Sequence, residues 1–135
     1  MKKISTFAAK CADCGQSFSH PSLGDFSYGE VILTTADGKQ FATANAFDEF
    51  PQRVATLAGT DPFWPVLASL ADPIAGQGLK HSIHCPHCGS DRLKYWDGNK
   101  TGTMSVPAAT FIAAASLSDE SLTAHIAAVG HHVSA

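Results

Sequence analysis

The alternation of apolar and polar positions first becomes regular over residues 29–44, which read GEVILTTADGKQFATA. Two β-prone runs flank the dipeptide Asp37-Gly38. Such a dipeptide between β-prone runs is among the strongest short signals for a hairpin turn. The pattern therefore predicts an antiparallel hairpin in this part of the chain.

A second region with β character lies further along the chain. Residues 79–83 predict one strand and residues 92–96 predict another. Asp97-Gly98 then predicts a turn into a further strand over residues 101–106.

Apolar positions recur with helical spacing between these two regions. Phe50, Val54 and Leu57 stand at i, i+4 and i+7, which is typical of one face of a short helix. Asp61-Pro62 has the composition of an N-cap and a first helical residue, so a second helix is expected from there to Asp72-Pro73. The apolar face of that helix would consist of Phe63, Val66, Leu67 and Leu70.

The last third of the chain is predicted to be helical. Thr110 is placed to cap a short helix that runs through Ala115. Ser118 is placed to open a longer helix that ends at Gly130. The longer helix would present the apolar positions Leu122, Ile126 and Val129.

These elements together predict an α+β fold in which short helices pack around antiparallel hairpins. At 135 residues, the chain is expected to form a single domain over residues 1–135. Within it, residues 29–73 would form an inserted hairpin with two helices, and residues 107–130 would form a C-terminal helical pair.

Four cysteines stand in two pairs of the form C-x-x-C-G, namely Cys11 with Cys14 and Cys85 with Cys88. Two intervening residues allow one tight turn to direct both sulfurs at a single ion, and the following glycine tolerates the positive φ that such a turn often needs. The pattern predicts one tetrahedral zinc site shared by both pairs.

The two turns, at residues 11–15 and 85–89, resemble the knuckles of the zinc-ribbon (rubredoxin-knuckle) superfamily. The resemblance implies antiparallel β-hairpins that carry the knuckles and share one structural zinc ion. The resemblance covers only about 20 residues, namely the knuckles and their flanking strands. About 70 residues separate Cys14 from Cys85. The insert must therefore be a folded αβ body of its own.

Other chemistry at the cysteines is less consistent with the sequence. A redox C-x-x-C motif is expected once, at the start of a helix, whereas this chain has two followed by glycine. Four cysteines would leave no open position for catalytic water, and the motifs of zinc hydrolases and deaminases are absent. Iron in place of zinc stays open. So does a role for the nearby His81, His84 and His87, which we expect to be strand-face or solvated side chains.

Composition narrows the class of protein. The formal net charge is −3 and the pI is near 6.1, and the nine Lys and Arg residues form no obvious basic patch in the sequence. Nucleic-acid-binding proteins usually carry such a patch. The apolar run after Lys2 and Lys3 is too short for a signal peptide, and no run is long enough to span a bilayer. We expect a cytoplasmic protein whose cysteines are thiolates rather than disulfides.

Two stretches are candidates for a partner surface. In DPFWPV the adjacent Phe63 and Trp64 cannot both face the core, and exposed aromatic residues are enriched at interfaces. In DRLKYW, a regular strand would separate Leu93 and Tyr95 from a basic and aromatic face. That face is either a solvated strand or a surface that stacks a nucleobase. The full candidate surface is Phe63, Trp64, Arg92, Lys94, Tyr95 and Trp96.

The closed cysteine set, the acidic balance and the lack of a recognisable catalytic motif favour a zinc-stabilised, non-enzymatic binding protein. An immunity or antitoxin-type protein of the bacterial cytosol that binds a basic toxin has this physical character. One alternative is a nucleic-acid-binding zinc ribbon in transcription or RNA handling. The other is a metalloenzyme with an open zinc site that uses His81 or His84.

Overall fold

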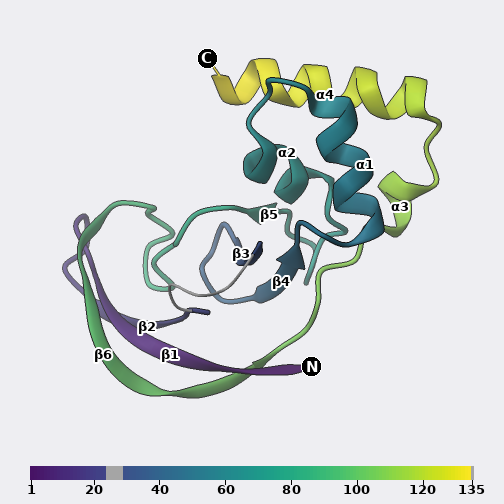
Figure 1. Ribbon diagram of the computed structural model, residues 1–135. Helices are drawn as coiled ribbons and strands as arrows, with labels where there is room; N and C mark the ends of the chain where they lie inside the picture. The colour runs from purple at the N-terminus through teal and green to yellow at the C-terminus, as the bar shows by residue number, and fades with distance from the viewer. Residues whose placement is uncertain (24–28, 135) are drawn as a thin grey trace.

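The computed structural model describes residues 1–23 and 29–134, which form two three-stranded antiparallel sheets and four helices. The helices gather at one end of the molecule, and the longer strands curve around the opposite end (Figure 1). The mixed α and β content and the antiparallel pairing agree with the sequence prediction.

Sheet A has the strand order β2-β1-β6. Its strands are β1 (Lys2–Cys11), β2 (Ser17–Pro21) and β6 (Leu93–Val106). The central strand β1 forms a hairpin with β2, and it pairs along its other edge with β6 in antiparallel register. Strands β1 and β6, which are far apart in the sequence, are therefore neighbours in one sheet.

Sheet B has the strand order β4-β3-β5, with β3 at Glu30–Thr35, β4 at Phe41–Asn45 and β5 at Leu79–Lys80. The predicted hairpin over residues 29–44 is confirmed, because β3 and β4 pair antiparallel on either side of the Asp37-Gly38 turn. After β6 the chain crosses to this sheet, where the N–H of Thr43 donates to the carbonyl of Pro107 at 2.9 Å.

The helices are α1 (Glu49–Ala58), α2 (Phe63–Leu70), α3 (Ile112–Ala115) and α4 (Asp119–Ser134). Helices α1, α2 and α4 pack against one another. The predicted apolar faces are confirmed, since the fully buried side chains include Val54, Val66, Leu67, Leu122 and Ile126.

Two hydrophobic clusters of unequal size hold the fold together. The larger joins sheet B to the helices around Leu33, which is completely buried. The smaller belongs to sheet A and consists of Ala9, Cys11, Phe18 and Cys85, with Ile83 and Leu93 packed against it. Because two of its four members are cysteines, the small core and the cysteine cluster stabilise the same region.

The turn predicted at Asp97-Gly98 is wrong, because β6 runs without a break from Leu93 to Val106. The extra residues are absorbed as a bulge. While β1 advances two residues from Phe7 to Ala9, β6 advances four, from Lys100 to Trp96. A bulge accommodates unpaired residues and bends the strand, so the dipeptide is consistent with a strand as well as with a hairpin.

Several predicted ends also differ from the structure. Strand β5 stops at Lys80 instead of residue 83, and the last helix continues past Gly130 to Ser134. Helix α2 begins at Phe63 after Pro62 in the N-cap position, so Asp61 is one residue too early to cap it.

The cap of α3 also comes from elsewhere than predicted. The carboxylate of Asp72, a residue that follows α2, accepts the backbone N–H groups of Ile112 at 2.7 Å and Ala113 at 3.2 Å. The hydroxyl of Thr110, the predicted cap, donates to the same carboxylate at 2.7 Å. Asp72 therefore caps α3 across a tertiary contact.

Candidate metal centre

The first knuckle is the turn between β1 and β2. Its backbone closes with two hydrogen bonds, from the N–H of Cys11 to the carbonyl of Gln16 (3.0 Å) and from the N–H of Gly15 to the carbonyl of Cys11 (3.2 Å). Gly15 has a φ of 73°, a conformation that favours glycine. The N–H of Cys14 points at the Cys11 sulfur at 3.5 Å.

The second knuckle, between β5 and β6, repeats this pattern. The N–H of Cys85 donates to the carbonyl of Ser90 (2.8 Å), and the N–H of Gly89 donates to the carbonyl of Cys85 (2.7 Å). Gly89 has a φ of 78°, and the N–H of His87 points at the Cys85 sulfur at 3.4 Å. The predicted role of glycine in the C-x-x-C-G turn is confirmed in both knuckles.

The knuckles differ in the strands that carry them. The first lies inside the β1–β2 hairpin, whereas β5 pairs with β3 of sheet B and β6 pairs with β1 of sheet A. The second knuckle therefore joins two sheets, and the hairpin expected there from the zinc-ribbon resemblance is not formed by β5 and β6.

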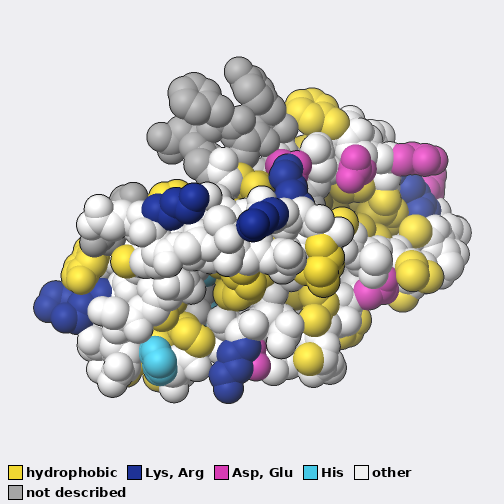
Figure 2. All heavy atoms as spheres, turned by 90° about the horizontal axis from the view of Figure 1, so that it is seen from below, with side chains coloured by type: hydrophobic (Ala, Val, Ile, Leu, Met, Phe, Trp, Pro, Cys, Tyr) yellow, Lys and Arg dark blue, Asp and Glu magenta, His cyan; other side chains and the backbone are white. Residues whose placement is uncertain are grey.

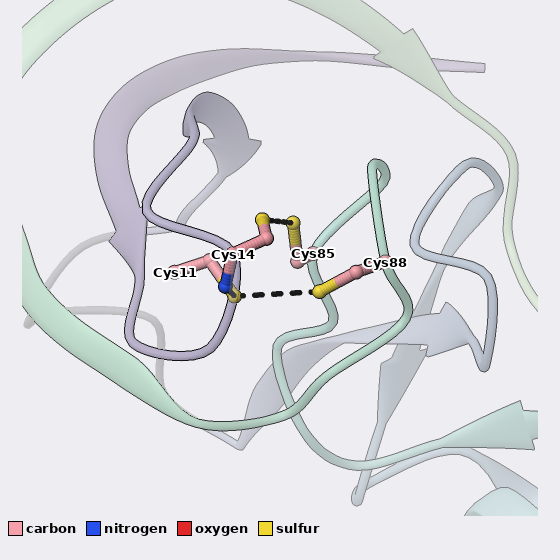
Figure 3. A group of neighbouring side chains, drawn as sticks. All are labelled: Cys11, Cys14, Cys85 and Cys88. Carbon is pink, nitrogen blue, oxygen red and sulfur yellow. Dashed lines mark hydrogen bonds between the residues drawn. The ribbon is translucent and has the colours of Figure 1, made fainter.

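The four cysteine sulfurs meet at one point between the knuckles (Figure 3). They all lie within 4.8 Å of one another, with 3.5 Å between Cys11 and Cys88 and 3.6 Å between Cys14 and Cys85. Tetrahedral zinc with bonds of about 2.3 Å to each thiolate needs sulfur separations of about 3.8 Å. The cluster thus has the donor chemistry and nearly the spacing of a metal site, and it could hold a metal ion.

Ionisation of the cluster favours a cation at its centre. The N–H of Cys14 lowers the pKa of Cys11 to about 6, so this sulfur is largely a thiolate at neutral pH. The N–H of Ser90 acts in the same direction on Cys88, but the nearby Cys11 sulfur and burial outweigh it and raise the pKa of Cys88 to about 12. A bound divalent cation would remove this repulsion and allow all four sulfurs to ionise.

The three nearby histidines do not join the sulfur cluster. Nδ1 of His84 donates to the carbonyl of Gly89 at 3.0 Å, which leaves Nε2 to accept from the Ser82 hydroxyl at 2.8 Å. His87 contacts the carbonyl of Ser17 at 3.3 Å, and His81 stacks on Trp64 at 5.7 Å between ring centroids. In this arrangement His84 braces the second knuckle rather than completing a metal site.

The turn of sheet B also supports the second knuckle, a relationship that sequence reasoning missed. Gly38 has a φ of 72°, and a Cβ atom placed on it would lie 2.3 Å from the carbonyl oxygen of His84. The backbone of the β3–β4 turn therefore presses directly on the knuckle. The Asp37-Gly38 signal indicated the turn but not this second reason for glycine.

Polar contacts connect the two knuckles beside the sulfurs. The Ser90 hydroxyl donates to the Asp13 carboxylate, and the Arg92 guanidinium lies 3.6 Å from the same group. The N–H of Ala12 donates to the carbonyl of Arg92 at 2.8 Å. These contacts preorganise the cluster, and they partly neutralise Arg92, one of the residues predicted for a partner surface.

The structure separates the remaining residues of the predicted partner surface. Phe63 and Trp64 are half-buried and pack against the larger core. Tyr95 pairs with Lys10, while Trp96 pairs with the buried Ala9 on the opposite face of sheet A.

The predicted alternation in DRLKYW fails for a specific reason. Leu93 pairs with Cys11, two residues of β6 away from Tyr95, although Cys11 and Lys10 are adjacent on β1. The bulge inserts one residue, so Leu93 and Trp96 lie on one face of the sheet and Tyr95 on the other, and both Trp96 and Tyr95 are exposed, by 41% and 48%.

Comparison of the chain with protein-family models, with curated proteins and with solved structures finds no match. Among the described residues, none of the helices combines the length and the apolar character needed to cross a membrane.

Proposed function

We propose that the chain is a non-enzymatic binding protein whose fold is stabilised by one structural zinc ion on zinc-ribbon-type knuckles. The observation that carries the proposal is the meeting of four cysteine sulfurs within 4.8 Å. Four thiolates complete a tetrahedral shell, and a complete shell has no position at which zinc could activate water or substrate. Zinc is preferred to iron because it forms such sites without redox chemistry.

The partner that we propose is a protein with a basic surface, as for an immunity or antitoxin-type protein. Support comes from the end of the helical layer where α1, α3 and α4 begin. Phe47 and Ile112 are 72% and 76% exposed, so most of each apolar side chain lies in solvent. The stacked rings of Phe50 and Phe111, with centroids 5.1 Å apart, hold the chain segments of these two residues together.

Acidic residues stand at the starts of α1 and α4. Asp48 and Glu49 begin α1, and Asp119 and Glu120 begin α4. Arg53, a cation in this region, is paired with Asp119 at 2.8 Å. An apolar centre with an acidic rim fits a partner whose own apolar patch is surrounded by Lys and Arg.

The test uses zinc-loaded protein as bait in a native lysate, beside a double variant, Phe47→Ser with Ile112→Ser. The matched control is Tyr95→Ser, which removes an exposed ring on sheet A. We expect a stoichiometric protein partner that the control retains and the double variant loses. Equal recovery by all three proteins, or metal-dependent turnover of a substrate, would contradict the proposal.

A further inference from the structure

The fold separates charges that look evenly spread in the sequence. Residues 1–22 and 90–106, which hold sheet A, contain six Lys or Arg and three Asp or Glu, a net charge of +3. The rest of the chain contains three Lys or Arg and nine Asp or Glu, a net charge of −6. The total of −3 thus conceals a net positive charge on the segments of sheet A and a net negative charge on the rest of the chain. In Figure 2 most visible Lys and Arg side chains lie over the half formed by sheet A.

One face of sheet A is open and polar. Ile4 and Thr6, and then Ala9 and Cys11, are buried on the inner face of β1. The helices pack at the other end of the molecule, so they leave the outer face uncovered (Figure 1). By register, the small side chains on the outer face are Ser5, Ala8, Ser17, Ser19, Thr103 and Ser105.

The outer face also carries cations and one exposed aromatic ring. Lys10 and Tyr95 are direct cross-strand partners, and Tyr95 is 48% exposed. Lys3 lies further along the same strand opposite Ser105, and Lys94, the residue that the bulge inserts between Leu93 and Tyr95, is exposed. Cross-strand partners have Cβ atoms about 5 Å apart, so an ammonium group and a phenol ring are presented side by side.

We propose that the outer face of sheet A binds single-stranded nucleic acid, with a base stacked on Tyr95 and phosphates contacted by Lys3, Lys10 and Lys94. A surface of small side chains admits the backbone of a nucleic-acid strand, and an aromatic ring beside cations matches the two parts of each nucleotide. Lys3 and Lys10 are at most about 23 Å apart along the strand, which suits a site of a few nucleotides. This surface is separate from the acidic helical end proposed to bind a protein.

The observations favour this occupant over other anions. Binding to an anionic membrane would be expected to bury a larger apolar area of the protein than one tyrosine ring. Duplex DNA would be contacted through phosphates alone, leaving Tyr95 without a role. Arg92 and Trp96, which the sequence also suggested for this role, are assigned no contact on this face, because Arg92 lies 3.6 Å from the Asp13 carboxylate and the 41% exposed Trp96 pairs with Ala9 on the other face of the sheet.

The test measures fluorescence anisotropy of a labelled mixed-sequence 12-nucleotide single strand with the zinc-loaded chain. Affinity should fall about 20-fold between 50 and 200 mM NaCl, as expected for three phosphate contacts. Tyr95→Ala should weaken binding about 10-fold. Lys10→Gln should weaken it and reduce the salt dependence by about one contact.

The control variants Lys39→Gln and Lys80→Gln remove the same charge outside sheet A and should bind as the unaltered chain does. Zinc content and thermal unfolding of each variant show that the fold is intact. The proposal is overturned by no binding at 50 mM NaCl, by equal losses in control and test variants, or by a Tyr95→Ala variant with full affinity. Preferential binding to phosphatidylserine vesicles or to duplex DNA would also overturn it.

Discussion

The sulfur of Cys11 lies 3.5 Å from the sulfur of Cys88, although 77 positions separate the two residues. This contact and its counterpart between Cys14 and Cys85 each run from one knuckle to the other. Closing so long a loop costs conformational entropy, which grows slowly with loop length. Metal binding of the strength seen in small zinc domains, about 10–16 kcal/mol, is ample to offset that cost.

Loss of one sulfur is therefore expected to release the metal. In Cys85→Ser, we expect zinc affinity to fall at least about 100-fold, because loss of an outer-shell partner alone typically costs 10–100-fold. The matched variant His87→Ala alters the same knuckle without touching a sulfur, and it should keep one zinc ion per chain. Metal content by mass spectrometry and competition with a chelator measure both. Retention of zinc by Cys85→Ser together with its loss in His84→Ala would instead indicate an open histidine-containing site.

Gly38 is expected to be more sensitive to substitution than other glycines with positive φ. In Gly38→Ala, backbone strain adds to a clash with the carbonyl of His84, so we expect a loss of more than about 2 kcal/mol of unfolding free energy and weaker zinc binding. Gly76 has a φ of 77°, and a Cβ atom added to it would meet no other atom within 4 Å, so Gly76→Ala should lose only about 1 kcal/mol. Urea unfolding of the zinc-loaded proteins gives both values. Equal losses would mean that the turn does not support the knuckle.

Local sequence patterns were sufficient to predict the elements in which the buried side chains recur at one regular spacing. The β3–β4 hairpin followed from Asp37-Gly38, and the buried faces of α1 and α4 followed from spacings such as Phe50 to Val54 and Leu122 to Ile126. The clustering of the cysteines followed from the C-x-x-C-G repeat, because both turns have the same local hydrogen bonds. In each case the signal lies within a few residues.

Strand β1 and its pairing with β6 in sheet A were missed because the buried positions along these strands do not recur at one regular spacing. In β1 the buried positions change from even numbers, Ile4 and Thr6, to odd numbers, Ala9 and Cys11, at a bulge between Thr6 and Phe7. Alternation fails for the same reason near Tyr95 in β6. The charge separation between sheet A and the rest of the chain depends on the pairing of β1 with β6. It could not be predicted without knowledge of that pairing.

A second relationship beyond the reach of local patterns is the cap of α3 by Asp72, about 40 positions earlier in the chain. We expect Asp72→Ala to lose about 1–2 kcal/mol of unfolding free energy, as for other lost N-caps. Asp61→Ala removes the residue that the sequence suggested as a cap but that makes no capping bond, so its loss should stay below about 0.5 kcal/mol. Chemical denaturation compares them, and a reversed order would refute the tertiary cap.

His20 makes stability depend on pH. Burial, and then electrostatic repulsion from His84, lower the pKa of His20 to about 4. Its side chain is 4% exposed, and Nδ1 has no hydrogen-bond partner. An unfolded chain would bind a proton at His20 with a pKa near 6.5, so between pH 6.5 and 4 the unfolded state holds more protons. Stability from this group is full above pH 6.5 and declines as the pH falls towards 4.

We expect this histidine to remove about 2 kcal/mol of unfolding free energy between pH 7 and pH 5, by linkage from the two pKa values. Protonation of the cysteines also weakens zinc binding over this range, so the variants are compared at the same zinc concentration. His20→Phe keeps a ring between Phe41 and Trp96 but cannot titrate, and its loss from pH 7 to 5 should be smaller by that amount. His125→Gln removes an exposed histidine on α4 and should follow the unaltered chain. Parallel curves for His20→Phe and the unaltered protein would show that His20 titrates equally in both states.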